Sequence, residues 1–327
     1  MKIMSYKQFG AAKDVLKLQE VNKPHVQAGE VLVRLHTSAV NPSDVKKRAG
    51  AFPELLAKGD IIPNSDGAGI IEAVGEGVSP ARVGERVWVY QAQHGRRYGT
   101  SAEFIRIENR RAAHLPNEAS FEVGACLGIP AMTAHRCVHA DGPVKNKIIL
   151  ITGGAGRVGF YAIQWAKMAG AFVIATASNA EDRQACLSVG ANAVVNHRAS
   201  DFAAQILQAS GGKLIERVVD VEFGANLEVI LQVIKTGAVI SSYSSTQEPE
   251  PKLPFYKMMY LDLTLRCIIV YAMPEEAKNM AINAIENALK QNQLCHRIAE
   301  VLPLTKAVKA HELVEQGKVK GSVILSI

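Results

Sequence analysis

The spacing of hydrophobic residues changes along the chain, and the first part has the pattern of a β-structure. In residues 1 to about 115, short segments alternate between apolar and polar positions and are separated by glycine and proline. Alternation with a period of two is typical of half-buried strands. We therefore predict a β-rich, barrel-like unit, with strands at 29–36, 68–74, 86–90 and 102–107.

From about residue 120 the spacing becomes helical, and it then switches repeatedly between two periods. Residues 122–140 are predicted to be helical. Beyond them we predict strands at 147–152, 171–177, 193–196, 216–221, 237–243 and 263–270. The predicted helices lie between them, at 157–169, 181–189, 201–209 and 224–235. This alternation is typical of an α/β fold whose parallel sheet is covered on both faces.

The C-terminal part of the chain returns to a mixed pattern. We predict a helix at 274–292, a strand at 298–302 and a further helix that begins with Thr305 as its N-cap. The last residues, 321–327, form an apolar run that reads as a closing strand. We expect this strand to rejoin the N-terminal β unit.

A glycine-rich turn follows the first buried strand of the α/β region. Gly153, Gly156 and Gly159 recur every three residues between that strand and an amphipathic helix. Glycine permits positive φ and close backbone approach, and a helix N-terminus favours negative charge. The turn is therefore a candidate pyrophosphate site. The spacing is G-x-x-G-x-x-G and not G-x-G-x-x-G, so a tight turn without a ligand is the alternative interpretation.

The end of the next predicted strand bears on which dinucleotide would bind. A site for NAD usually has Asp or Glu there, to hold the ribose 2′-OH. Here residues 176–179 read Thr-Ala-Ser-Asn, and the first carboxylate is Glu181. Ser178 leaves room for a 2′-phosphate, with Arg183 and Arg198 as candidate cationic partners. We therefore predict NADP(H), although Arg183 could equally be an ordinary solvated helix residue.

Composition and charge exclude several classes of protein. The 327 residues are 48% hydrophobic, enough for two domains with sizeable cores. No run of eighteen apolar residues occurs and the start lacks a signal-peptide core, so we expect a cytoplasmic protein without a membrane span. The five cysteines form no C-x-x-C pair, which predicts reduced thiols. The net charge of +6 is spread along the chain, so nucleic-acid binding is not expected.

Several motifs in order resemble the medium-chain dehydrogenase/reductase superfamily. They are N-P-S-D at 41–44, D-G-A-G-I-I-E-A-V-G at 66–75, V-G-E-R-V at 83–87, the glycine turn and N-H-R at 196–198. The last two resemble the zinc-independent quinone oxidoreductase, or zeta-crystallin-like, branch. The resemblance covers essentially the whole chain. It implies a Rossmann-type doubly wound domain (123–268), a GroES-like catalytic domain (1–122) and a C-terminal segment that returns to the latter (269–327).

The resemblance also bears on metal binding. Zinc-binding relatives hold a catalytic metal on a Cys, a His–Glu pair and a second Cys, and the matching positions here are Asn41, Ser65-Asp66 and a position near Ile129. Such a set cannot form a tetrahedral zinc site with one carboxylate, and the nearby Cys126 adds only one thiol. We therefore expect no metal, and simple alcohol dehydrogenation becomes an unfavourable reading.

The resemblance further implies which residues line the acceptor pocket. Asn41 is carried over as an amide that could hydrogen-bond an acceptor carbonyl, with an Asx-turn before Pro42 as the alternative interpretation. Relatives often place two tyrosines a few residues later, where this chain has Lys46 and Phe52. Tyr243, predicted to end a sheet strand at the cofactor edge, is a candidate proton donor.

Other cofactor-binding residues enter through the resemblance. Thr133 matches a residue that often faces the nicotinamide, and His197 matches one that flanks the adenosine phosphate. Ser241 begins the segment 241–244 at the end of the fifth strand, near the expected nicotinamide ribose. The predicted cofactor-binding residues are Thr133, Gly153, Gly156, Arg157, Val158, Gly159, Ser178, Arg183, His197, Arg198 and Ser241.

These observations favour a zinc-independent, NADPH-dependent quinone reductase. An NADPH-dependent alkenal or enone reductase shares the fold and the cofactor, and the sequence does not separate the two. An NADPH-binding protein that interacts with RNA without catalysis is a third reading, which no aromatic–basic motif supports. The apolar sixth strand, 263–270, would leave a sheet edge that relatives pair across a two-fold axis, so we expect a homodimer or homotetramer.

Overall fold

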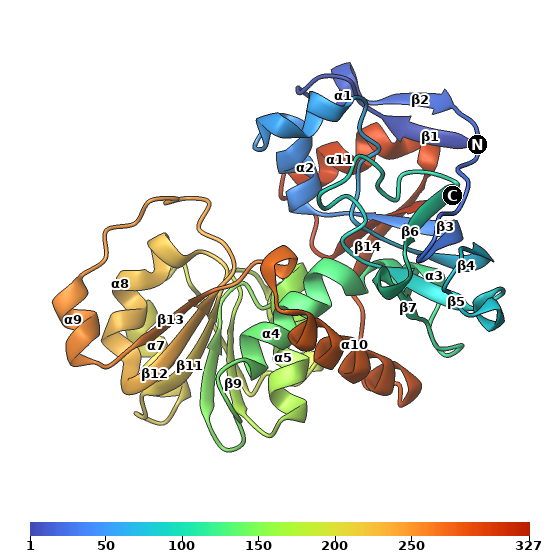
Figure 1. Cartoon of the computed structure of the whole chain (residues 1–327). Helices are drawn as coiled ribbons and strands as arrows, with labels where there is room; N and C mark the ends of the chain where they lie inside the picture. Colours follow the sequence, from blue (N-terminus) through green and yellow to red (C-terminus); the bar gives the residue numbers. More distant parts are fainter. The chain divides into compact units, whose positions relative to one another are not determined.

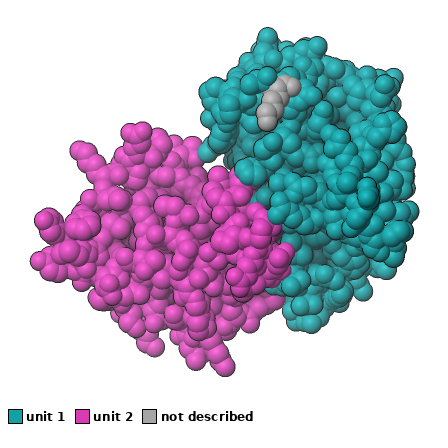
Figure 2. Space-filling view, in the orientation of Figure 1, with its two compact units in different colours: residues 1–129, 282–327 teal, residues 130–281 magenta. Residues whose placement is uncertain are grey.

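The structure, a computed structural model, describes residues 1–57 and 59–327 and divides into two compact units. Unit 1 comprises residues 1–129 and 282–327, and unit 2 comprises residues 130–281 (Figure 2). The predicted domain limits, after residues 122 and 268, stay a prediction, because packing units need not coincide with domains. No helix of the described residues has the length and apolar character needed to cross a membrane.

Unit 2 is built on a six-stranded sheet in which all neighbouring strands are parallel (Figure 1). Its strands are β8 (Ile148–Ile151), β9 (Phe172–Thr176), β10 (Ala193–Val195), β11 (Ile215–Asp220), β12 (Ile234–Ser242) and β13 (Thr264–Cys267). Their order is β10-β9-β8-β11-β12-β13, so the connections reverse direction between β8 and β11. This reversal creates a topological switch point, and the predicted Rossmann-type doubly wound sheet is confirmed.

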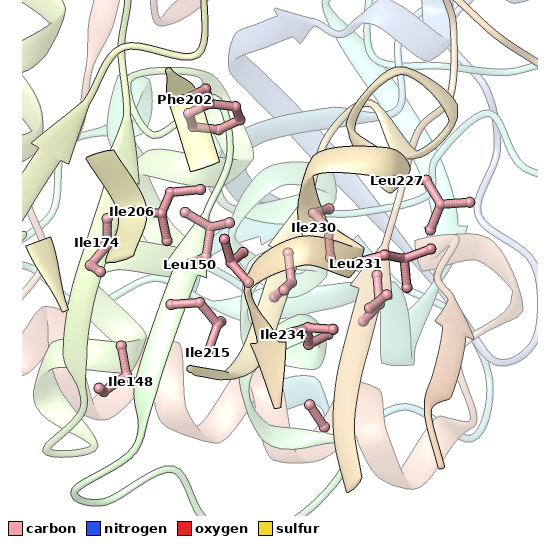
Figure 3. Close-up of a cluster of buried hydrophobic side chains, with 14 of the residues drawn as sticks. Ile148, Leu150, Ile174, Phe202, Ile206, Ile215, Leu227, Ile230, Leu231 and Ile234 are labelled. Carbon is pink, nitrogen blue, oxygen red and sulfur yellow. The ribbon is translucent and has the colours of Figure 1, made fainter. Parts of the chain in front are cut away.

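Helices cover both faces of this sheet. They are α4 (Met132–His139), α5 (Arg157–Met168), α6 (Ala180–Ser188), α7 (Phe202–Ala209), α8 (Phe223–Val233) and α9 (Phe255–Tyr260). On one face, α7 and α8 pack against strand side chains (Figure 3). Ile206 and Ile230 from these helices and Leu150, Ile174 and Val218 from the strands are all fully buried there. The other face is covered by α4 and α5 (Figure 1). Strands buried on both faces explain the continuous apolar runs in the sequence.

Unit 1 is β-rich, as predicted. Its strands are β1 (Lys2–Ser5), β2 (Lys17–Glu20), β3 (Glu30–Val40), β4 (Asp66–Val74), β5 (Arg86–Val89), β6 (Phe104–Glu108), β7 (Ala112–His114), β14 (Ile298–Pro303) and β15 (Ser322–Ser326). A seven-stranded sheet runs β14-β15-β3-β4-β5-β7, with β6 also paired to β3, and β1 pairs with β2. Strand β15 lies antiparallel to β3, with Val323 opposite Val40. The closing strand therefore rejoins the N-terminal β unit as expected.

The helices associated with unit 1 are few. They are α1 (Ala12–Val15), α2 (Pro42–Ala49), α3 (Phe121–Ala125) and α11 (Ala307–Glu315), and α10 (Glu275–Lys290) extends across the limit between the two units. The sequence pattern gave no sign of α2, because three of its four buried residues are charged: Asp44, Lys47 and Arg48. A helix whose buried face carries charges lacks the apolar periodicity from which helices are recognised.

The predicted helix at 122–140 is present but divided into α3, a π-helix at Leu127–Ala131 and α4. Pro130 lies inside the π-helix, and proline cannot donate the backbone hydrogen bond of a regular helix. One local prediction was wrong. Thr305 does not cap the last helix. It lies within a 3₁₀ turn that begins after Pro303, and Lys306 is the N-cap of α11.

Candidate active site

The glycine turn connects the end of β8 to α5 and allows an unusually close backbone approach. Gly153 has φ +61°, a conformation that favours glycine. Gly156 is the N-cap of α5 and has extended φ and ψ. A Cβ atom on Gly159 would lie 2.3 Å from the carbonyl oxygen of Gly153. The first turn of α5 therefore packs directly on the backbone of the loop that precedes it.

Hydrogen bonds hold the turn against the neighbouring strand β9. The N–H of Gly153 donates to Thr176 Oγ1 at 2.9 Å, and the N–H of Gly154 donates to the Thr176 carbonyl at 3.0 Å. The first N–H groups of α5, which include those of Val158 and Gly159, have no carbonyl of their own helix to bind. They lie at the carboxyl edge of the sheet, beside the switch point, where a helix N-terminus attracts a phosphate. The residues present therefore fit a dinucleotide pyrophosphate.

The carboxyl ends of β9 and β10 bring the predicted 2′-phosphate residues to one edge of the sheet. Thr176 in β9 pairs with Val195 in β10, and the two strands are parallel. The segment with Ser178, which follows β9, therefore leaves the sheet at the same edge as the segment with His197 and Arg198, which follows β10. The side chains of His197 and Arg198 are exposed, and Ser178 is half-buried. No Asp or Glu ends β9.

Asn179 and Arg183 have local structural contacts at this edge. Asn179 caps α6, because its Oδ1 accepts from the N–H of Asp182 at 2.8 Å. Asn179 Nδ2 in turn donates to the Asp182 carboxyl group, which is buried. The Arg183 guanidinium donates to the carbonyl of Val194 in β10. Arg183 therefore has a structural contact between α6 and the sheet, besides its predicted contact with a 2′-phosphate.

The far end of the same edge carries the predicted nicotinamide-side residues. Ser241 is fully buried in β12, opposite Val219. Tyr243 follows this strand and borders a cavity of about 460 Å³, whose wall is mainly apolar and includes Cys267 at the end of β13. Burial raises the pKa of Tyr243 well above its usual value, so the phenol stays protonated at neutral pH. Thr133 is buried near the start of α4.

Unit 1 contains a separate buried polar cluster around the N-terminus of α2. Asn41 is the N-cap of α2 and Pro42 follows at its first position. Asn41 Nδ2 donates to Asp66 Oδ2 at 2.9 Å, and the N–H of Ile129 donates to the same oxygen at 2.8 Å. The backbone N–H of Asn41 donates to Asp44 Oδ2 at 2.9 Å. The positions that the resemblance singled out are thus neighbours in space.

A buried lysine belongs to the same cluster. Lys47 Nζ donates to the carbonyl of Gln93 at 3.1 Å and lies 3.5 Å from Ser65 Oγ. Ser65 Oγ in turn donates to Asp44 Oδ1 at 3.0 Å. Lys47 is 5% exposed and Asp44 is 1% exposed, so the cluster is almost dry. Sequence reasoning missed both residues. The available signal was their spacing of three, which places them on one helical face.

Burial and mutual charge set the ionisation of this cluster. Desolvation raises the pKa of Asp66 to about 8, although the N–H of Ile129 opposes the shift, and Asp44 adds to it. Burial also raises the pKa of Asp44 and lowers that of Lys47, while the attraction between these two opposes both shifts. At neutral pH Asp66 is therefore mainly protonated.

The chemistry of the cluster does not fit a catalytic zinc ion. The matching positions offer an amide, a hydroxyl, a carboxyl and the backbone at Ile129, and zinc sites are built from thiolates, imidazoles and carboxylates. One oxygen of the only carboxyl among them already accepts two N–H bonds. Cys126 Sγ donates to the Glu122 carbonyl. Within the described ranges no group of three His, Cys, Asp or Glu residues could hold a metal.

The other predicted pocket residues differ from Asn41 in exposure. Lys46 is exposed on α2, whereas Asp44 and Lys47 of the same helix are buried. Phe52 follows α2 and is 42% exposed. Their predicted contact with an acceptor stays a prediction.

Comparison with known proteins identifies the family. The zinc-binding dehydrogenase model matches residues 158–287, and the alcohol dehydrogenase GroES-like domain model matches residues 27–145. A quinone oxidoreductase from Sus scrofa is 30% identical over 319 residues, which cover 95% of this chain and 94% of the relative. The chain belongs to the medium-chain dehydrogenase/reductase superfamily, in its zeta-crystallin-like branch. This medium-chain enzyme is an NAD(P)-dependent oxidoreductase.

Two further similarities concern ligands and substrates. The structure of a mycobacterial protein complexed with NADPH is 25% identical, with a TM-score of 0.87, and the two chains cover each other completely. A 2-methylene-furan-3-one reductase from Solanum lycopersicum is 32% identical over 208 residues, which cover 62% of this chain and 53% of the relative. The predicted superfamily and its two-part fold are thereby confirmed.

The close approach at Gly159 makes a test of the glycine turn. We expect Gly159→Ala to weaken NADPH binding at least tenfold, about 1.4 kcal/mol, because the new methyl group would displace the first turn of α5. Gly212→Ala is the matched control, since it adds a methyl group elsewhere in unit 2 where a Cβ would have no atom within 4 Å. Fluorescence titration with NADPH measures both affinities. Equal affinity of Gly159→Ala and the unchanged protein would show that the turn does not hold the cofactor.

The raised pKa of Asp66 predicts how stability depends on pH. An unfolded Asp ionises near pH 3.9, whereas folded Asp66 ionises at about 8, so between these values the folded state binds one more proton. The contribution of Asp66 to stability is therefore greatest below about pH 3.9 and falls, by up to about 1.4 kcal/mol per pH unit, as pH rises through this window. We expect Asp66→Asn to remove this contribution and flatten the profile between pH 5 and 8.

Urea unfolding at several pH values measures this effect. Asp262→Asn, at an exposed position, is the control that removes a carboxylate without changing the buried cluster. A pH slope in Asp66→Asn as steep as that of the unchanged protein would contradict the assigned pKa.

Proposed function

We propose that the protein reduces quinones with NADPH, without a metal. The main support is the similarity, along 95% of the chain, to a quinone oxidoreductase. Two observations agree with it: the glycine turn fits a pyrophosphate, and the positions that match the zinc ligands of relatives do not form a zinc site among the described residues. Bound NADPH would supply a hydride, and a quinone that accepts this hydride and one proton becomes a hydroquinone.

The proposed role of the chain is to hold and orient the reactants. The turn at Gly153–Gly159 and the N-terminus of α5 would bind the pyrophosphate. In unit 1, Asn41 would donate a hydrogen bond to an acceptor carbonyl, whose oxygen gains negative charge when the hydride arrives. Tyr243 is a candidate source of the proton, since its phenol stays protonated.

NADPH is proposed over NADH because of the residues at the ends of β9 and β10. No carboxylate ends β9 to bind a ribose 2′-OH or to repel a 2′-phosphate. Ser178 leaves space at this point, and Arg198, with His197 beside it, provides an exposed cation from the adjacent strand end. The structure of the mycobacterial relative was determined with NADPH, which agrees with this preference.

Reduction of a C=C bond in an enone is the second candidate function. It is favoured by the similarity to the tomato 2-methylene-furan-3-one reductase. The same cofactor and the same donor to a carbonyl would serve both reactions, and the shape of the acceptor pocket would decide between them.

We also propose a homodimer that forms through the edge of the unit 2 sheet. Strand β13 has a neighbour, β12, on one side only. The helix that precedes β13 exposes several large apolar side chains, among them Phe255, Tyr256 and Tyr260. An unpaired edge beside such a patch favours self-association. A monomer mass in sedimentation velocity would refute this assembly.

The oxidation of NADPH, followed at 340 nm with a metal chelator present, tests the proposed reaction. The acceptors are 1,4-benzoquinone, a naphthoquinone, an α,β-unsaturated aldehyde and a simple ketone. We expect turnover of the quinones that the chelator does not change. Turnover of the unsaturated aldehyde alone would favour the second candidate, and binding of NADPH without turnover of any acceptor would refute both.

Cofactor preference depends on the cation that follows β10. We expect Arg198→Ala to raise the Kd for NADPH about tenfold, the loss of one charge-assisted contact of about 1.4 kcal/mol. The Kd for NADH should stay unchanged, because NADH has no 2′-phosphate. Lys213→Ala, which removes another exposed cation of unit 2, is the control. Equal weakening of NADPH and NADH would refute the proposed contact between Arg198 and the 2′-phosphate.

A further inference from the structure

The carboxyl group of Asp66 joins two segments that are distant in sequence to the N-terminus of α2. Its Oδ2 atom accepts from Asn41 Nδ2 and from the backbone N–H of Ile129. Its Oδ1 atom is buried without a hydrogen-bond partner and lies against Gly128, on which a Cβ would be only 2.1 Å away. The carboxyl group is 0% exposed and is therefore held in one position.

This arrangement determines which end of the Asn41 amide faces Asp66. Oδ2 accepts from the backbone N–H of Ile129, which can only donate, and it also accepts from Asn41 Nδ2. The carbonyl oxygen of Asn41 is therefore turned away from Asp66. One Nδ2 hydrogen of Asn41 is used in the bond to Asp66. Because the amide group is planar, the direction of this bond also fixes the direction of the second Nδ2 hydrogen.

The backbone of Asn41 is fixed by the other members of the cluster. Its N–H donates to Asp44, and Asp44 also accepts from Ser65, which Lys47 approaches. Lys47 interacts electrostatically with both buried carboxyl groups, those of Asp44 and Asp66. Both the main chain and the side chain of Asn41 are therefore held by charged or polar groups with little access to water.

We propose that Asp66 is a positioning residue, which fixes the Asn41 amide so that its second Nδ2 hydrogen is presented to an acceptor carbonyl. The inference rests on the proposed function, in which Asn41 binds that carbonyl. Orientation of a donor before the reaction is what makes a hydrogen bond effective in a transition state. Asp66 contributes by acting through Asn41 and does not touch the acceptor.

Two substitutions of Asp66 separate this role from a general structural one. Asp66→Asn keeps an oxygen that can accept from Asn41 and Ile129, whereas Asp66→Leu has a similar shape and no acceptor. We expect Asp66→Leu to lower kcat for a quinone about tenfold, the loss of about 1.4 kcal/mol in the transition state. The Kd for NADPH should not change. Asp66→Asn should keep most of the activity at pH 7, and equal loss in both variants would overturn the proposal.

A double-mutant cycle tests whether Asp66 acts through Asn41. If it does, Asp66→Leu will lower kcat in the unchanged protein and have little further effect when Asn41→Ala is already present. Independent effects that multiply in the double variant would overturn the proposal.

A measurement that needs no activity keeps the inference separate from the proposed function. In protein labelled with ¹⁵N-asparagine, the side-chain signals of Asn41 are identified by their loss in Asn41→Ala. We expect slow hydrogen exchange of the Asn41 amide compared with the exposed Asn117, retained in Asp66→Asn and lost in Asp66→Leu. Exchange of Asn41 as fast as that of Asn117 in the unchanged protein overturns the inference. If no quinone is reduced but this protection is found, the proposed function fails and the positioning by Asp66 stands.

Discussion

The close contact between α5 and the loop before it is the constraint on which the cofactor site depends. A Cβ on Gly159 would lie 2.3 Å from the Gly153 carbonyl, so only glycine lets the first helical turn approach the end of β8. This approach brings the helix N-terminus to the switch point of the parallel sheet. The sheet supplies the remaining candidate residues at the same edge, because every strand in it runs in the same direction. The parallel sheet that forms the core of unit 2 therefore also brings the candidate cofactor residues to one edge.

Much of unit 2 could be predicted from the sequence. Strands β8 and β9 are buried almost throughout, so each appears as a continuous apolar run in the sequence. The closing strand β15 was also predicted, since its apolar run follows Gly321. In unit 1 the four strands predicted before residue 115 correspond to β3, β4, β5 and β6. In these regions local pattern and tertiary burial agree.

The sequence could not reveal the parts of the structure that depend on distant contacts. Helix α2 buries charged side chains. Their role becomes clear only in the folded chain, where Asp66, 25 positions after Asn41, lies beside the N-terminus of this helix. The N–H of Ile129 comes from a π-helix around Pro130, 63 positions after Asp66. The glycine motif was visible because its residues are adjacent in sequence. The polar cluster was found only in part: the resemblance marked Asn41 and Asp66 as site positions, included Asp44 only as the last residue of the N-P-S-D motif and did not include Lys47.

The two parts of the candidate site illustrate different uses of polar groups. At the cofactor edge, backbone N–H groups and exposed cations are available to an anionic ligand. In the cluster around Asn41, buried groups mostly bond to one another, and the ammonium group of Lys47 interacts with the carboxyl groups. The first arrangement suits binding, and the second suits holding one amide in a defined orientation.

The central claim is that NADPH, with its pyrophosphate at the glycine turn, would supply a hydride directly to a quinone. Single-turnover reduction of 1,4-benzoquinone, with a chelator present, by NADPH deuterated on either face of C4 tests it most directly. The account predicts a primary isotope effect with one stereoisomer and none with the other. Equal rates for both stereoisomers and unlabelled NADPH, with deuterium retained on the oxidised cofactor in each case, would contradict it.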